Sequence, residues 1–218
     1  MSNLKTILKN IRKELKEKDT TRETAHAAMR KATSLSKQSI LLIHQRRNRD
    51  AKKLIEEAKA IISKLGEMAT KYPHISYSGM LDAAHQEYAE ANIFLHLVEE
   101  KEFLTPQEVG VPSVDYVLGL ADVIGEFRRV ALDALREDNV EKGEGCLSIM
   151  DDIYVDLMAL DDAYMLVSGL RRKCDVARKI IEITRGDITQ EVRRNALEKH
   201  LELFEKRAKA RKRSSGKV

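Results

Sequence analysis

The sequence predicts an all-α protein, and three observations support this fold class. Hydrophobic residues make up 43% of the 218 residues and charged residues 34%, enough for one domain with a substantial core. Only three prolines and ten glycines interrupt the chain. Alternation with a period of two is scarce, whereas Ala, Leu, Ile, Glu, Lys and Arg recur at helical spacing. We therefore expect an antiparallel bundle of about seven helices.

Three long helices are expected in the first half of the chain. The first covers residues 3–45 and begins with an apolar stripe formed by Leu4, Ile7, Leu8, Ile11 and Leu15. Asp50 is placed to cap the second helix. That helix ends before Pro73, because proline disfavours helix in the residue that precedes it. The third helix is expected over residues 76–101.

The second half begins with a connector in which Thr105, Pro106 and Glu108 suit a short capped turn. A long helix is expected over residues 114–135, and Gly143 and Gly145 then mark a loop or a frayed helix start. Helices over residues 146–160 and 163–184 follow.

The end of the chain is expected to contain one more helix and a tail. The polar segment 185–191 separates this last helix from the preceding one, with Asp187 or Thr189 as its cap. Residues 1–204 are expected to form a single domain. Residues 205–218 are basic, and we expect them to be a disordered tail.

Charge and cysteine content exclude some classes of protein. The net charge of +4 permits nucleic-acid binding but does not require it. Cys146 and Cys174 lie far apart without a CxxC pattern, so neither a disulfide framework nor a zinc site is indicated. No stretch approaches about 18 consecutive apolar residues, so we expect no membrane association and a cytoplasmic protein.

Four carboxylates in two apolar helices are the main chemical signal. Glu87 and Glu90 are spaced i, i+3, while Asp122 and Glu126 are spaced i, i+4, so each pair shares a helix face. Two facing helices would bring three or four of them together, where a divalent cation would offset their charge. Oxygen ligands suit Mg²⁺ or Mn²⁺, and such an ion can activate water against a phosphodiester.

Two glycines on the later helix, Gly119 and Gly125, would let another backbone or a substrate approach this place. Two other interpretations of the acids remain open. They can form a solvated strip in which each pairs with lysine or arginine, or they can belong to a di-iron bundle. The chain has one Glu-x-x-His pair, Glu23 with His26, and lacks a second, so the di-iron interpretation is weaker.

Two basic clusters are candidates for contact with nucleic-acid phosphates, and the alternative for each is a solvated helix face with ion pairs along the helix. Arg46, Arg47 and Arg49 stand in a stretch with few acids, and Arg128 and Arg129 lie two and three residues after Glu126. Tyr88 and Tyr116 are candidates for base stacking, although core packing or a hydroxyl hydrogen bond fits each of them better.

Two long motifs resemble the translin/Trax family. "HQEYAEANIFLHLVEE" resembles the "QEYVEA" helix of Trax, the translin-associated factor X, and "PSVDYVLGLADVIGEFRR" resembles its Asp-Tyr and Ala-Asp-x-x-Gly-Glu block. "SILLIHQ" is similar to the segment that closes the first helix in both proteins, and the resemblance extends to about Gly186.

This resemblance implies a seven-helix fold that assembles into closed octamer-like shells. Translin binds single-stranded RNA and DNA, and Trax is a Mg²⁺-dependent endoribonuclease. The resemblance implies that Glu87, Glu90 and Asp122 are catalytic and hold the metal, with Glu126 as a fourth acid. The chain is shorter than eukaryotic Trax and lacks the insertion before its Val-Asp-Tyr block, as in an archaeal single-gene member. This favours a homo-oligomer.

The sequence therefore predicts an endoribonuclease that cleaves single-stranded RNA with Mg²⁺ or Mn²⁺. One alternative is a non-catalytic protein of the translin type that binds single-stranded RNA or DNA. Another is a purely structural helical shell with ion-paired carboxylates.

Overall fold

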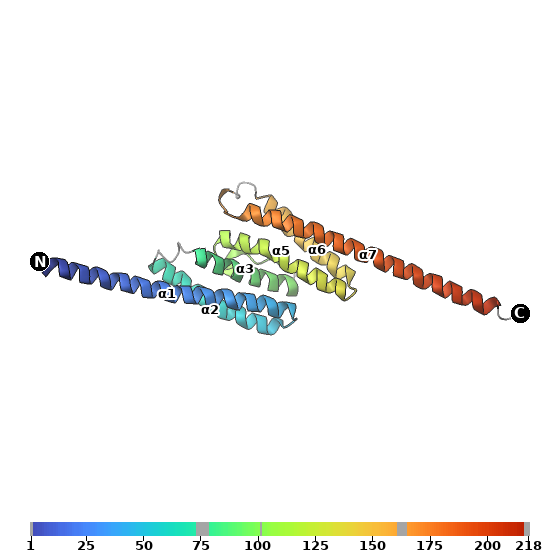
Figure 1. Cartoon of the computed structure of the whole chain (residues 1–218), viewed down its shortest axis with the longest axis horizontal. Helices are drawn as coiled ribbons and strands as arrows, with labels where there is room; N and C mark the ends of the chain where they lie inside the picture. The colour runs from blue at the N-terminus through green and yellow to red at the C-terminus, as the bar shows by residue number, and fades with distance from the viewer. Residues whose placement is uncertain (1, 73–78, 101, 161–164, 216–218) are drawn as a thin grey trace. The chain divides into compact units, whose positions relative to one another are not determined.

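The structure is a computed structural model that describes residues 2–72, 79–100, 102–160 and 165–215. All the regular elements in these ranges are helices (Figure 1), namely α1 (Ser2–His44), α2 (Asn48–Lys71), α3 (Gly79–Glu99), α4 (Pro106–Val109), α5 (Ser113–Arg136), α6 (Val140–Met158) and α7 (Leu170–Ser215). The predicted all-α bundle of about seven helices is confirmed. No helix in the described ranges is long and apolar enough to cross a membrane.

The chain divides into two compact units. The first consists of Met1–Val123 and Val167–Leu170, and the second of Ile124–Leu166 and Arg171–Val218. The boundary falls inside α5, so the first half of this helix packs in one unit and the second half in the other.

Helices α1 and α2 form an antiparallel pair in the first unit (Figure 1). The buried residues of α2 recur every three or four positions, at Ala51, Ile55, Ala58, Ile62 and Leu65. Those of α1 follow the same spacing and include the small residues Ala25, Ala32, Ser36 and Ser39. This is the pattern of a coiled-coil seam, and small side chains let the two helices approach closely.

Helix α3 is the most deeply buried helix of this unit. Its buried residues surround the helix rather than forming one stripe, and they are Leu81, Ala84, His85, Tyr88, Ala89, Glu90, Ala91, Ile93, Phe94, Leu95 and Leu97. A helix that is covered on all sides lies inside the bundle. Two contacts show that α3 runs parallel to α1. Lys37 of α1 forms an ion pair with Glu87 of α3, and His44 packs its ring against that of Phe94. Both partners of the second contact lie seven residues after those of the first.

The second unit repeats the same packing pattern with α6 and α7. Buried residues at spacings of four and three occur on α6, at Cys146, Met150, Ile153 and Leu157, and on α7, at Cys174, Ala177, Ile181, Thr184 and Ile188. The Thr184 hydroxyl donates to the Ile180 carbonyl over 2.7 Å and accepts from the Arg128 guanidinium over 2.7 Å. The buried hydroxyl is therefore satisfied.

The helix boundaries confirm some predictions and correct others. Thr105 and Glu108 form a capping box that begins α4, as expected. Asp50 is not a cap: it lies in the first turn of α2, where it binds Arg47 and Lys53. The boundary predicted at Pro73 lies outside the described residues, and α2 ends at Lys71.

Two predicted breaks in the second half are wrong. Gly143 and Gly145 lie within α6, whose N-cap is Asn139, with its side chain accepting from the Lys142 amide. Segment 185–191 lies within α7 and does not separate two helices. Its polar residues form ion pairs across the unit, since Arg185 binds Asp151 and Asp187 binds Arg128. These pairs hold the segment against its neighbours as helix.

The described part of the predicted tail is helical as well, because α7 continues to Ser215. Glu202 and Glu205 pair with Lys206 and Lys209 at i, i+4 spacing, which supports an exposed helix. Disorder from residue 205 is thus not what the structure shows, and residues 216–218 lie outside the described ranges.

The continuity of α7 leads to a stability prediction at Gly186. A Cβ at this helical position meets no described atom within 4 Å. Gly186→Ala should raise the free energy of unfolding by roughly 0.5–1 kcal/mol, because alanine loses less backbone entropy in a helix. Denaturant unfolding measures this. Gly110→Ala, at a residue with φ of 80°, is the matched control and should destabilise. A destabilising Gly186→Ala would contradict the continuous helix.

Candidate functional site

Helices α3 and α5 touch at Gly119. A Cβ placed on this residue would lie 2.7 Å from the Gln86 carbonyl oxygen and 3.1 Å from the Glu90 amide nitrogen. Both atoms belong to the α3 backbone and cannot move aside, so only glycine allows this contact. The expected close approach is therefore confirmed at Gly119. At Gly125 a Cβ would meet no described atom within 4 Å.

A buried polar pair connects the same two helices one turn earlier. His85 Nδ1 donates to Asp115 Oδ2 over 3.0 Å, and Gln86 Nε2 donates to Asp115 Oδ1 over 3.2 Å. Both His85 and Asp115 are buried. Burial, followed by the charge of Asp115, raises the pKa of the nearby Asp82 carboxyl, while His85 lowers it. Through its hydrogen bond to Asp115, His85 links α3 to α5.

These contacts also fix the direction of the two helices. Asp115 meets His85, and four residues later Gly119 meets Glu90, so α3 and α5 run parallel. Asp122 lies one turn beyond Gly119, on the side of α5 that also carries Asp115 and Gly119.

The two predicted acids of α3 have different surroundings. Glu90 is buried, with 8% of its surface exposed, next to the Gly119 contact. Glu87 lies one turn earlier and faces α1, where Lys37 Nζ is 3.0 Å from its carboxylate. The Glu87 side chain is 25% exposed and the Lys37 side chain 61%. The interpretation of the acids as ion-paired is thus correct for Glu87.

The predicted metal centre remains a prediction. Glu126 lies a further turn along α5, in the second unit. Among the described residues, no three His, Cys, Asp or Glu side chains are arranged so that they could hold a metal ion. The chemistry of the donors fits Mg²⁺, because all four predicted ligands are carboxylates.

The structure gives the predicted basic residues unequal surroundings. Arg47 binds Asp50 over 2.9 Å, and the neighbouring Lys52 binds Glu99 over 2.7 Å. Acidic side chains therefore neutralise part of this basic stretch, which the sequence did not predict. Arg49 is exposed, and Arg46 has a left-handed backbone with φ of 60°.

The cluster after Glu126 is also divided. The Arg128 guanidinium is engaged by Thr184 and Asp187 of α7, at 2.7 and 3.3 Å, and therefore links helices of the second unit. Arg129 is exposed. Of this pair, Arg129 is the residue whose position suits contact with a phosphate.

Both tyrosines considered for base stacking belong to the core. Tyr88 is 1% exposed, and burial raises its pKa to about 12. The Tyr116 hydroxyl donates to the Leu104 carbonyl. Burial also raises the pKa of Tyr116. Both rings are thus held away from a solvent-exposed base.

Sequence reasoning missed a basic pocket on α1. An open pocket of about 590 Å³ is lined by α1 residues between Arg30 and Leu41 and by Met80 and Ala83 of α3. Lys37 lines this pocket and also binds Glu87, so the pocket adjoins the acidic residues. The seven-residue spacing of Arg30 and Lys37 on one helix face was the available signal.

These features define a class of protein: an all-α bundle whose buried acidic residues lie where two parallel helices touch. The chain belongs to the translin family, whose model matches residues 20–182. An uncharacterised protein of Methanocaldococcus jannaschii is 35% identical over 189 residues, covering 86% of this chain and 83% of that protein.

Solved structures of similar proteins agree with this assignment. The crystal structure of AfC3PO has a TM-score of 0.76 and 34% identity, covering 84% of this chain and 96% of that chain. AfC3PO has also been solved in a complex with duplex RNA, with a TM-score of 0.75 and coverage of 84% and 95%. Apo-NeC3PO, at 24% identity and a TM-score of 0.76, shares the fold.

The contact at Gly119 predicts a specific sensitivity. Gly119→Ala should lower the free energy of unfolding by about 1–3 kcal/mol, because the added methyl group forces α5 away from the α3 backbone. Gly125→Ala, on the same helix with open space around it, is the control and should be neutral or stabilising. Thermal unfolding of both variants measures the difference. Equal stability of the two would contradict the close contact.

The buried link at Asp115 leads to a second prediction. Asp115→Ala leaves His85 buried without its acceptor, and should cost about 1–3 kcal/mol of unfolding free energy. The control is Asp133→Ala, which breaks an exposed pair with Arg136 and should change stability by less than about 0.5 kcal/mol. Urea unfolding compares them. A cost for Asp115→Ala no larger than that of the control would show that the link does not hold α3 on α5.

Proposed function

We propose that this protein binds RNA and cleaves it at the acidic residues where α3 meets α5. The observation that carries the proposal is the burial of Glu90 at the Gly119 contact, with Glu87 one turn earlier on the same helix. Carboxylate oxygens are ligands that Mg²⁺ and Mn²⁺ prefer in proteins.

RNA as the substrate is supported by the relatives. AfC3PO, 34% identical over most of this chain, forms a complex with duplex RNA. The resemblance to Trax points to single-stranded RNA, so both forms belong in the assay. Lys37, Arg49 and Arg129 are exposed cations suited to phosphate contact.

In the proposed reaction, Glu90 and Asp122 would hold Mg²⁺ or Mn²⁺ together with Glu87 and Glu126. When bound, such an ion would supply Lewis acidity toward a phosphodiester and its attacking water. Lys37 keeps Glu87 in place before RNA binds and then faces the substrate phosphates. Assembly into a closed homo-oligomeric shell is part of the same proposal.

A non-catalytic RNA-binding role is the second candidate. The ion pair between Glu87 and Lys37 favours it, since it already compensates one of the four acids. Binding would then depend on the exposed arginines and lysines alone, and would weaken steeply with salt.

Cleavage assays distinguish the two candidates. Labelled single-stranded and duplex RNA are incubated with Mg²⁺, Mn²⁺ or a chelator. Glu90→Gln and Asp122→Asn should each slow cleavage by about 100-fold or more, on the scale seen when a charge-stabilising group is removed, while RNA binding is retained. Glu102→Gln, an exposed acid outside the site, is the control.

Each outcome has a defined meaning. Undiminished cleavage by both site variants would contradict the catalytic assignment. RNA binding without cleavage under either metal would support the second candidate. Absence of binding to both RNA forms would contradict both candidates and leave a structural shell.

A further inference from the structure

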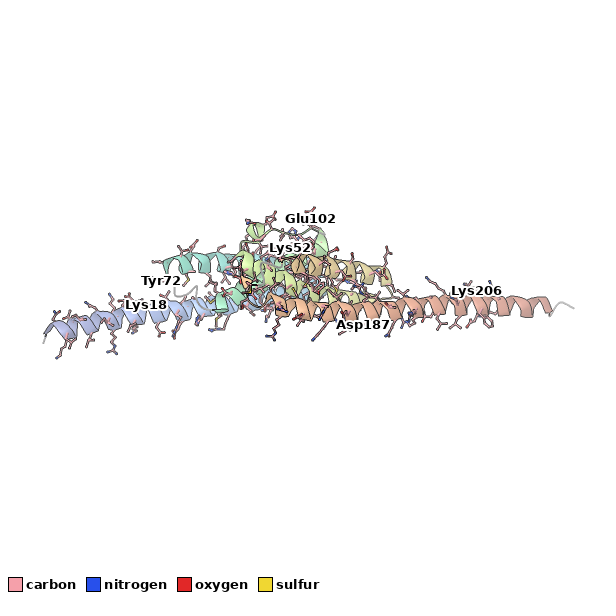
Figure 2. The ribbon with its side chains drawn as sticks, turned by 90° about the horizontal axis from the view of Figure 1, so that it is seen from above. Lys18, Lys52, Tyr72, Glu102, Asp187 and Lys206 are labelled. Atoms are coloured by element: carbon pink, nitrogen blue, oxygen red, sulfur yellow. The ribbon has the colours of Figure 1, made fainter. Side chains whose placement is uncertain are left out.

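The first part of α1 carries an exposed apolar stripe outside the region that matches the family. Leu4, Leu8, Ile11 and Leu15 are 45–62% exposed, and residues 3–20 have no buried side chain. The match to the translin family begins at residue 20. The stripe has spacings of four, three and four, which is the pattern of a coiled-coil seam without a partner helix. Figure 2 shows the helix around Lys18 with its side chains projecting into open space.

The last part of α7 carries a second stripe with the same spacing. Leu197, Leu201 and Phe204 are 55–72% exposed, and they lie beyond residue 182, where the family match ends. The helix around Lys206 also projects its side chains outward in Figure 2. Both ends of the family core therefore continue as amphipathic helices whose apolar faces are uncovered.

The charges beside the two stripes are opposite. In α1, Lys5 and Arg12 directly follow Leu4 and Ile11, while in α7, Glu198 and Glu205 directly follow Leu197 and Phe204. These are equivalent heptad positions beside the seam, which face one another in an antiparallel coiled coil. Within the described ranges, the two acids form exposed pairs in their own helix, with Arg194 at 3.9 Å and Lys209 at 3.4 Å, and such pairs contribute little.

We infer that the α1 stripe of one copy pairs antiparallel with the α7 stripe of a second copy. The register that matches both patterns places Leu15 on Leu197, Ile11 on Leu201 and Leu8 on Phe204. Arg12 then lies beside Glu198, and Lys5 beside Glu205. Pairing of two α1 stripes is disfavoured, because it would set Lys5 and Arg12 of one copy against the same cations of the other.

Each copy carries both stripes, so two copies can make this contact twice in a closed dimer, or the contact can continue to further copies. It is independent of the proposed function, because it uses residues remote from the acidic site. It is also distinct from a shell built by the family core, since both stripes lie outside the matched residues.

Cross-linking between two differently tagged full-length chains tests the pairing. One chain carries Ile11→Cys and the other Leu201→Cys, and a short bis-maleimide reagent joins them. The native cysteines, Cys146 and Cys174, are buried and do not compete. The matched control is a mixture of Lys13→Cys and Lys199→Cys chains, whose cysteines lie on the opposite helix faces.

We expect a covalent dimer that contains both tags from the first mixture and its loss in the control mixture. Adding Arg12→Glu to the first chain should lower the yield, and adding Glu198→Arg to the second should restore it. A yield no higher than the control would overturn the inference. So would equal cross-linking of the Ile11→Cys chain with itself, because that would indicate pairing between two α1 helices.

Discussion

The close approach of α3 and α5 at Gly119 is the constraint on which the acidic site depends. The missing side chain at this residue allows the α5 backbone to lie against Gln86 and Glu90. That distance in turn brings Asp115 within hydrogen-bond reach of His85. The contact lies beside the buried Glu90. Any side chain at Gly119 would separate the helices and loosen each of these features together.

The polar residues of α3 are costly where they lie. A helix that is covered on all sides is stabilised best by apolar residues, and most of α3 follows this rule. His85 departs from it with a defined acceptor, Asp115, so its cost is offset and it orients the two helices. Glu90 is buried on the same helix, at the backbone contact, where packing alone would favour an apolar side chain. His85 therefore has a structural role, whereas Glu90 supplies a carboxylate at the contact where the function is proposed.

The sequence predicted elements well where periodicity alone determines them, and poorly where tertiary contacts decide. Helix α1 and the capping box of α4 depend on local pattern and were predicted closely. The continuity of α7 depends on the ion pairs of Asp187 and Arg185 with distant residues, which outweigh a local glycine. At the site, i, i+3 spacing predicted one shared face for Glu87 and Glu90, whereas in the structure Glu87 faces α1 and Glu90 lies at the contact with α5. The pairing of Glu87 with Lys37 depends on the register of α1 on α3, which no local pattern contains.

The two proposals made for this chain involve different helices: the acids lie on α3 and α5, and the apolar stripes lie on α1 and α7. Helix α1 is continuous from Ser2 to His44, so Leu15 and Lys37 are separated by roughly 33 Å along its axis at 1.5 Å per residue. Contacts at the stripe therefore cannot reach the acids directly. The matched core, residues 20–182, contains the acids, the Gly119 contact and the basic pocket. The stripes of the proposed coiled coil lie outside this core, so changes in them leave the proposed acidic site in place.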